Sequence, residues 1–265
     1  MKYRFIDLFA GAGGLSEGFI RAGYEAIAHI EMDHYACDSL KTRAAFHYLK
    51  ENEKLDIYED YLKNKKEKTD GSWLWNQVPK HVIDSVIQEA IGKETLPSLF
   101  ERVDKLCNGK PIDMIIGGPP CQAYSVAGRV RDENGMKDDY RNYLFEHYLN
   151  VVNRYRPKLF VFENVPGILS AAPDGTPITQ LIRKGFEKIG YKILDDLRFA
   201  KVNASEYAVP QNRERMIIVG IDAKRYKDAD KYLRLFYEEI LPEFKAGRVV
   251  TVREAIGDLP SCTPN

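Results

Sequence analysis

The sequence predicts an α/β fold in which helices cover both faces of a central, mostly parallel sheet. Short apolar runs over residues 5–9, 26–30, 112–116 and 159–162 have the length of buried strands, and segments with helical spacing separate them. A glycine or an acidic residue directly follows three of these runs, and the glycine-rich stretch 10–14 follows the first. Open α/β sheets bind ligands at the carboxyl ends of their parallel strands, so we expect the site there.

Composition is that of an ordinary globular protein. The chain has 265 residues, 44% of them hydrophobic and 29% charged, enough for one large α/β domain over residues 1–265. The formal net charge of zero does not indicate a nucleic-acid partner. No apolar run approaches the roughly 20 residues of a membrane span, so we expect no membrane association. The four scattered cysteines lack metal-ligand or disulfide spacing, so we expect no metal site and a reducing cytoplasm.

A glycine-rich turn follows the first expected strand. Residues 10–14 are Ala-Gly-Ala-Gly-Gly, and a helix is expected from Leu15 to Ala22. Glu31 ends the second strand twenty residues after Gly11, where nucleotide-binding α/β units place the acid that binds ribose hydroxyls. A plain tight turn with a solvated acid is the alternative.

The ligand of this turn is predicted to be S-adenosylmethionine rather than a dinucleotide. The third glycine of the dehydrogenase pattern is missing, and an acidic Asp7 inside the first strand suits a ligand with a positive centre. S-adenosylmethionine has an adenosine, and its sulfonium and ammonium groups supply the positive centre.

The segment after the second strand begins as a helix over 36–50 and then changes character. We expect a helical insertion at about 47–84, with a densely charged stretch from Lys54 to Lys68 followed by Trp73 and Trp75. Basic and aromatic residues can contact nucleic acid, although such a run is more often a solvated face. A third strand over 86–91 and a helix over 96–106 are expected next.

The stretch from Gly117 to Gln122 follows the strand at 112–116. Two glycines allow a sharp turn, and two prolines stiffen the chain and remove backbone donors beside Cys121. A reactive thiolate is favoured here over a packing cysteine. The largely aperiodic loop over 122–141 is interpreted as a lid, followed by a helix over 143–152.

A second strand end carries a carboxylate. The strand over 159–162 leads to Glu163, for which a cap on the next turn is the alternative role. Beyond it we expect a helix at 185–189, strands at 191–193 and 216–220, a loop at 203–210, a charged helical tail from 222 and a final helix at 251–256. Strand alternation would place Arg213 and Arg215 on the same side.

In this order, the segments 7–14, 118–122, 163–165 and 211–215, together with Glu31, resemble the DNA (cytosine-5)-methyltransferases. The resemblance runs from residue 5 to about 220. It implies a Rossmann-like fold that uses S-adenosylmethionine, yields S-adenosylhomocysteine and methylates carbon 5 of cytosine in double-stranded DNA. The target base would be flipped out of the duplex.

The resemblance also implies a role for each matching residue. Cys121 would be the nucleophile, Glu163 would contact the target ring, and Arg215 would hold the base near its carbonyl. The family's acid near the adenine amine is matched by Glu89, with Asp56 as the alternative. The implied sets are Cys121, Gln122, Glu163, Arg213 and Arg215 for catalysis; Pro120, Ser125, Asn164 and Val165 for the base; and Asp7, Phe9, Ala10, Gly11, Gly13, Gly14, Leu15, Glu31, Met32, Glu89, Pro119 and Leu144 for the cofactor.

The sequence departs from the family's pattern after Thr251. The target-recognition domain and the C-terminal closing segment are not found, so we expect either a truncated form or a split enzyme completed by a second polypeptide. A bacterial or archaeal cytoplasmic enzyme, associated with the nucleoid, is the expected setting. A methyltransferase-like binding module without turnover, and a nicotinamide oxidoreductase, are the alternative functions.

Overall fold

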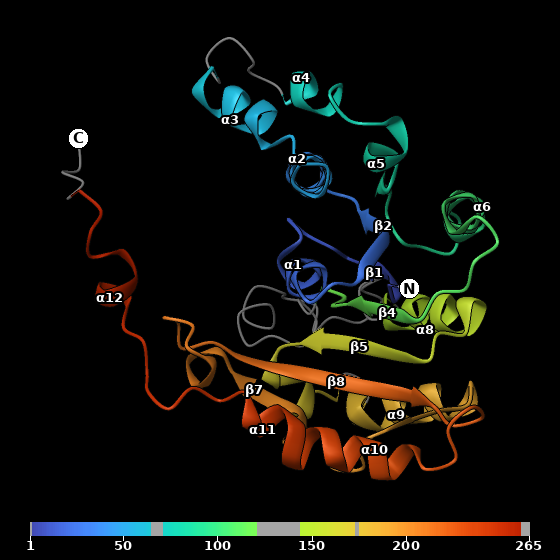
Figure 1. Ribbon diagram of the computed structural model, residues 1–265. Coiled ribbons are helices and arrows are strands. Elements are labelled where there is room, and N and C mark those ends of the chain that lie inside the picture. Colours follow the sequence, from blue (N-terminus) through green and yellow to red (C-terminus); the bar gives the residue numbers. More distant parts are fainter. Residues whose placement is uncertain (1, 65–70, 121–143, 173–174, 261–265) are drawn as a thin grey trace, which may run out of the picture. The chain divides into compact units, whose positions relative to one another are not determined.

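The computed structural model describes residues 2–64, 71–120, 144–172 and 175–260. The predicted site residues Cys121, Gln122 and Ser125 lie outside these ranges. The chain has the expected α/β architecture, with a mostly parallel sheet flanked by helices (Figure 1). It divides into two compact units, one of residues 1–120 and 140–161 and the other of residues 121–139 and 162–265.

The first unit contains a parallel sheet in the strand order β3-β2-β1-β4. The strands are β1 (Arg4–Leu8), β2 (Glu25–Glu31), β3 (Val86–Gln88) and β4 (Met114–Gly117). Every residue of β1 and of β4 is buried, which explains why their sequences are mostly apolar and do not alternate between apolar and polar residues. Because all four strands are parallel, their carboxyl ends lie at one edge of the sheet.

Helices cover both faces of this sheet. They are α1 (Gly14–Arg21), α2 (His34–Glu51), α6 (Leu96–Cys107) and α8 (Leu144–Tyr155). Phe5 of β1 packs on Phe19 of α1, while Ile6, its neighbour in the strand, lies with residues of α6 and α8. Successive side chains of a strand point to opposite faces, so α1 is on one face and α6 and α8 are on the other. This confirms the predicted layering.

The insertion is helical, as expected, and it has a core of its own. It comprises α3 (Leu55–Lys63), α4 (Ser72–Trp75) and α5 (Lys80–Asp84). Leu74 and Tyr61 join Leu49 of α2 in a buried cluster, and Trp73 and Trp75 pack against it. The aromatic half of the insertion is therefore a packed layer on α2 and not a solvated face.

The second unit is built around β8 (Glu214–Asp222), which pairs antiparallel with β6 (Tyr191–Ile193) and β7 (Lys201–Asn203). Residues 162–164 of β5 (Leu159–Asn164) belong to this unit and neighbour β8. The remaining elements are η2 (Pro166–Leu169), α9 (Ile178–Lys188), η3 (Leu197–Ala200), η4 (Ala204–Tyr207), α10 (Ala229–Leu235), the π-helical η5 (Phe236–Ile240), α11 (Leu241–Glu243) and α12 (Val252–Ile256).

Three expected elements were wrong in their bounds or missing. The third strand ends at Gln88 instead of residue 91, so Glu89 follows the strand. Helix α9 begins at Ile178, not at 185, because Ile178, Ile182 and Phe186 form one buried stripe. Strand β7 ends at Asn203, where the expected loop begins, and was missed, since three residues with no full burial carry no periodic signal.

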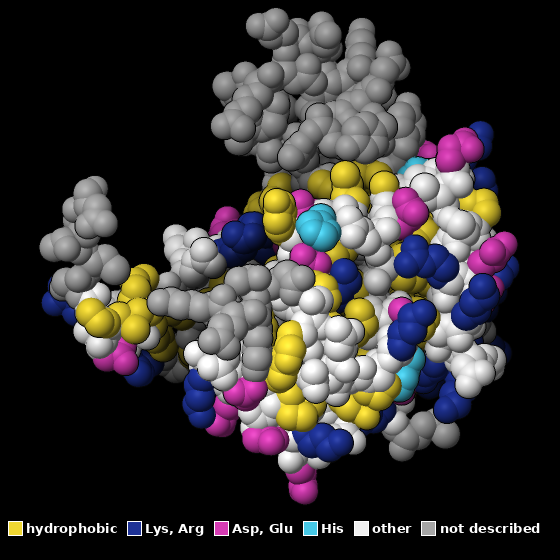
Figure 2. Space-filling model, turned by 90° about the horizontal axis from the view of Figure 1, so that it is seen from above, with side chains coloured by type: hydrophobic (Ala, Val, Ile, Leu, Met, Phe, Trp, Pro, Cys, Tyr) yellow, Lys and Arg dark blue, Asp and Glu magenta, His cyan; other side chains and the backbone are white. Residues whose placement is uncertain are grey.

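The surface is mixed in charge. On the face shown in Figure 2, Lys and Arg side chains are interspersed with Asp and Glu among the described residues. This matches the formal net charge of zero. No helix in the described part of the chain is both long and apolar enough to cross a membrane.

The insertion cluster gives a first prediction. Leu74 is fully buried in it, so Leu74→Ala should lower the free energy of unfolding by about 2–5 kcal/mol through lost burial and a residual cavity. Leu62 lies in the same insertion but its side chain is 51% exposed, and Leu62→Ala should cost less than about 0.5 kcal/mol. Urea unfolding of the two variants measures the difference, and equal small losses would contradict a packed insertion.

Candidate active site

The turn between β1 and α1 has an unusual backbone that places a large side chain at the sheet edge. Phe9 is half-buried and has a φ of 56°, and Gly11 and Gly13 have φ values of 53° and 83°. An aromatic residue in the left-handed region costs about 1–2 kcal/mol. Such strain persists where the surroundings impose it, most often at binding sites. The Ala10 amide donates to the Ile30 carbonyl at 3.1 Å, which ties this turn to β2.

Glu31 holds the ends of the first two strands together. Its Oε2 accepts the Gly11 amide at 2.8 Å, and its Oε1 accepts the amides of Met32 at 2.8 Å and Asp33 at 2.9 Å. An ionised carboxylate offers about four acceptor positions, so it can still accept from a ligand. The Glu31 carboxylate is therefore fixed in orientation at the end of β2.

The backbone of this turn is open to close approach. Among the described residues, a Cβ added to Gly11 or Gly14 would meet no heavy atom within 4 Å. Met32, directly after Glu31, has an exposed fraction of 62% and is free to cover a ring. An open glycine turn beside a held carboxylate is what an adenosine with its ribose requires.

The structure separates the two candidates for the adenine acid. Glu89 comes directly after β3, and its amide donates to the Glu31 carbonyl at 2.9 Å. Asp56 lies instead in the first turn of α3, in the insertion. Glu89 is thus the acid at the same sheet edge as Glu31.

Gly13 and Gly117 are required for a different reason, which is close packing. A Cβ on Gly13 would lie 2.9 Å from Leu40 Cδ2, so its absence lets α1 approach α2. A Cβ on Gly117, whose φ is 148°, would lie 2.1 Å from the Leu8 carbonyl oxygen. These glycines were predicted as turn formers, and their tertiary neighbours supply the constraint. Pro119 and Pro120, buried and exposed respectively, complete the described part of that segment.

Asp7 does not sit at the sheet edge. Its side chain is buried beneath the turn, and its Oδ2 lies 3.5 Å from Nδ1 of His29 in the neighbouring strand. His29 carried no role in the sequence-based prediction. The register pair Asp7 and His29 could have been found from the sequence only by assuming that β1 and β2 are adjacent.

In the second unit, Glu163 and Arg215 form an ion pair, with Nε and Oε1 2.9 Å apart. They come from the end of β5 and the start of β8, and the side chains are 30% and 24% exposed. Arg215 Nη1 also donates to the Glu214 carbonyl at 2.7 Å. Asn164 is buried and accepts the Val165 amide, which fixes the turn after Glu163.

The two arginines differ in their surroundings. Arg213 precedes β8 and is exposed, with its amide donating to Asn203 Oδ1, so strand alternation does not apply to it.

Leu144, predicted near the cofactor, is the first residue of α8 and is buried. The structure thus brings together Phe9, Gly11, Glu31 and Glu89 in the first unit, and Glu163 with Arg215 in the second.

These features define an α/β protein with a nucleotide-type cofactor turn and a charged pair at a second strand end. The chain belongs to the family of C-5 cytosine-specific DNA methylases, whose model it matches over residues 3–71 and 88–263. The match leaves out residues 72–87, which contain α4 and α5 of the insertion.

Individual relatives support this assignment. The chain is 34% identical to the type II methyltransferase M.Bpa9945I of Bacillus paralicheniformis over 98% of its own length and 61% of the relative's. It is 34% identical to the type II methyltransferase M.XorII of Xanthomonas oryzae over 96% of its length and 46% of the relative's. The chain therefore spans about half to three fifths of these relatives.

Among solved structures, the chain resembles a prophage-encoded E. coli protein assigned as a DNA modification methyltransferase. The TM-score is 0.58 and the sequence identity 29%, over 98% of this chain and 56% of the other. The structural similarity therefore extends over nearly the whole of this chain.

Two buried cysteines give a second prediction. Burial, reinforced by the nearby Glu31 carboxylate, raises the pKa of the Cys37 thiol to about 11, and burial also raises the pKa of Cys107. At pH 8 both should stay protonated thiols, and reactivity should appear only as the pH rises toward the raised pKa.

Iodoacetamide labelling at pH 8 followed by peptide mapping tests this. Cys37 and Cys107 should remain unlabelled in the folded protein and become labelled after denaturation in urea. Labelling of folded Cys37 at the rate of a free thiol would contradict it.

Proposed function

We propose that this chain is the catalytic part of a DNA methyltransferase that transfers a methyl group from S-adenosylmethionine to carbon 5 of cytosine. The observation that carries the proposal is the ion pair of Glu163 and Arg215 at the end of β5. Family membership supplies the context, because the relatives named above are type II methyltransferases.

The cofactor would be held in the first unit. Glu31 would accept the ribose hydroxyls, Phe9 would stack on the adenine, and Glu89 would lie near the adenine amine. When bound, S-adenosylmethionine supplies an electrophilic methyl group. Met32, Pro119 and Leu144, with the turn at residues 10–15, would complete the pocket.

Cys121 would make carbon 5 reactive. Its thiolate adds to carbon 6 of the cytosine, which forms a sulfur–carbon bond and moves the electrons of the ring double bond toward carbon 5. After methylation a base removes the carbon 5 proton, the sulfur–carbon bond breaks, and both the aromatic ring and the thiolate are restored. Gln122, Pro120 and Ser125 would adjoin the base there.

Glu163 would act at ring nitrogen 3, where electron density accumulates as the thiolate adds. A carboxyl group that holds a proton at this nitrogen lowers the cost of addition. Arg215 holds the Glu163 side chain by a charge-assisted contact. It would also donate to the cytosine carbonyl. Asn164, Val165 and Arg213 would support the base from the same unit.

Double-stranded DNA would be the substrate, with the target cytosine flipped out of the duplex, since a stacked base cannot reach a thiolate or a carboxyl at a strand end. We include in the proposal a target-recognition segment supplied by a second polypeptide or by a longer form of this one. The setting would be the bacterial or archaeal cytoplasm, at the nucleoid.

The nucleophile is tested directly by Cys121→Ala. The variant should lose methyl transfer altogether yet bind S-adenosylmethionine much like the wild type, because most of the proposed cofactor residues, Phe9 and Glu31 among them, lie in other segments. Tritiated-methyl transfer to DNA and equilibrium dialysis measure the two properties, with the target-recognition segment present. Cys262→Ser is the control and should retain activity; methylation by Cys121→Ala would refute the mechanism.

Glu163→Gln tests the acid. The amide keeps the shape but cannot exchange a proton in the same way, so the single-turnover rate should fall at least about 10²-fold. Glu214→Gln is a matched control, because Glu214 lies beside Arg215 but pairs with Lys201 at 2.9 Å on the surface. A loss of less than tenfold in Glu163→Gln would reduce Glu163 to a structural role.

A further inference from the structure

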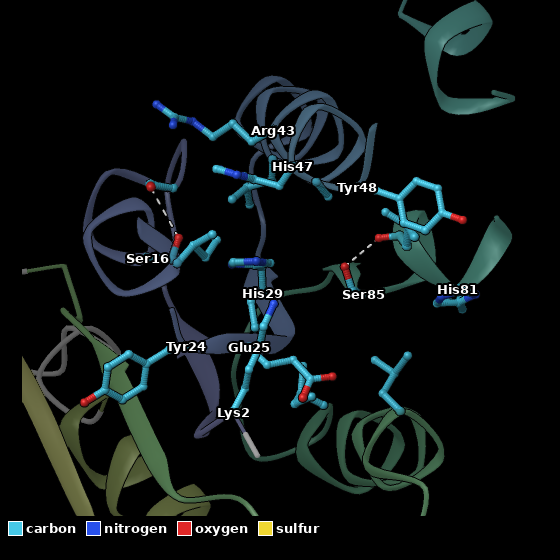
Figure 3. Close-up of a pocket in the computed structure, with 18 of the residues that line it drawn as sticks. Lys2, Ser16, Tyr24, Glu25, His29, Arg43, His47, Tyr48, His81 and Ser85 are labelled. Carbon is cyan, nitrogen blue, oxygen red and sulfur yellow. Dashed lines mark hydrogen bonds between the residues drawn. The ribbon is translucent and has the colours of Figure 1, made fainter. Parts of the chain in front are cut away.

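A cavity of about 480 Å³ lies beside β2, between helices α1 and α2. Figure 3 shows His29 in its wall, with Ser16 of α1 on one side and Arg43 and His47 of α2 above. Of the residues predicted to bind the cofactor, Gly13 alone lines this cavity. The cavity is therefore distinct from the sheet edge that carries Phe9 and Glu31.

Asp7 lies against His29. The two residues are partners in the register of β1 and β2, and their exposed fractions are 1% and 4%. The distance between His29 Nδ1 and Asp7 Oδ2 is 3.5 Å, slightly longer than an ordinary hydrogen bond. Among the described residues, no hydrogen bond reaches either carboxylate oxygen of Asp7 or Nδ1 of His29.

Several other charged groups of the cavity form pairs of their own. Glu17 accepts from Arg43 at 3.0 Å and contacts His47 at 2.9 Å, which bridges α1 and α2. Lys2 pairs with Glu51 at 2.8 Å at the opposite mouth. A buried carboxylate without a partner is strongly unfavourable, and His29 is the group placed to satisfy Asp7.

The position of the pair in the strands connects it to the proposed cofactor site. Asp7 is two residues before Phe9, and His29 is two residues before Glu31. The contact between the side chains therefore lies directly beneath the bond from the Gly11 amide to the Glu31 carboxylate. A change in the spacing of β1 and β2 at the pair would move both cofactor-binding residues.

We propose that Asp7 and His29 are positioning residues. The Nδ1 proton of His29 is donated to the Asp7 carboxylate, and this pair fixes the strand ends that carry Phe9 and Glu31. This role rests on the proposed function, since it presumes that these two residues bind the cofactor. In this role Asp7 acts through His29 and does not contact the ligand.

Substitutions at the pair test the role through cofactor affinity. His29→Ala and Asp7→Ala should each weaken S-adenosylmethionine binding about tenfold, and the double variant should be no weaker than either, because all three remove the same interaction. His29→Asn should recover binding to within about threefold of the wild type, since its amide can donate near the position of Nδ1. Isothermal titration calorimetry gives the dissociation constants.

The matched control is a second His–Asp pair on the surface. His34 Nε2 lies 3.4 Å from Asp38 Oδ2, and the His34 side chain is 62% exposed. His34→Ala and Asp38→Asn should change the affinity less than about twofold. Equal losses in His29→Ala and His29→Asn, or additive losses in the double variant, would overturn the positioning role.

A nitrogen-15 NMR measurement on the wild type is independent of variant folding. The proposal requires a proton on Nδ1 of His29, whichever charge state the imidazole has. A spectrum with Nδ1 unprotonated overturns the proposal. Absence of binding of both S-adenosylmethionine and S-adenosylhomocysteine by the wild type would instead refute the proposed function.

Discussion

The bond from the Gly11 amide to the Glu31 carboxylate is the contact on which the first unit's site depends. It joins the turn after β1 to the end of β2, and it can form only because the two strands are parallel neighbours. A charge-assisted bond of this kind is about twice as strong as a neutral one, which helps to hold Phe9 in its left-handed conformation. The bond that orders the Glu31 side chain thus also helps to maintain the strained backbone of Phe9.

In the second unit, too, a donor from another segment holds a carboxylate at the end of a strand. The Arg215 guanidinium holds the Glu163 carboxylate, and the buried Asn164 fixes the backbone that follows. In both units a carboxylate at the end of a strand is held by a donor from another segment far away in the chain. Pre-set side chains of this kind lower the cost of ordering the site when a ligand binds.

Much of the fold followed from local patterns. Strands β1 and β4 are buried throughout and β2 is buried at residues 27–30, and such strands are mostly apolar in sequence. Shorter elements were harder to predict from the sequence. Strand β7 has three residues and exists because β8 pairs with it, and the insertion helices are held by their shared cluster around Leu74. Neither feature has a strong local signal, since both depend on contacts between distant segments.

The sequence by itself determined the glycine turn, the acid that ends β2 and the order of the motifs, because these depend on spacing along one strand–turn–helix unit. The tertiary structure alone decided the partners of the charges. It set Asp7 against His29 and Glu163 against Arg215, and it directed the Tyr148 hydroxyl to the carbonyls of Ile115 and Val161. Such pairs depend on which strands lie next to each other, which the hydrophobic pattern of a single segment does not specify, whereas the cost of burying an unpaired polar group favours them once the chain folds.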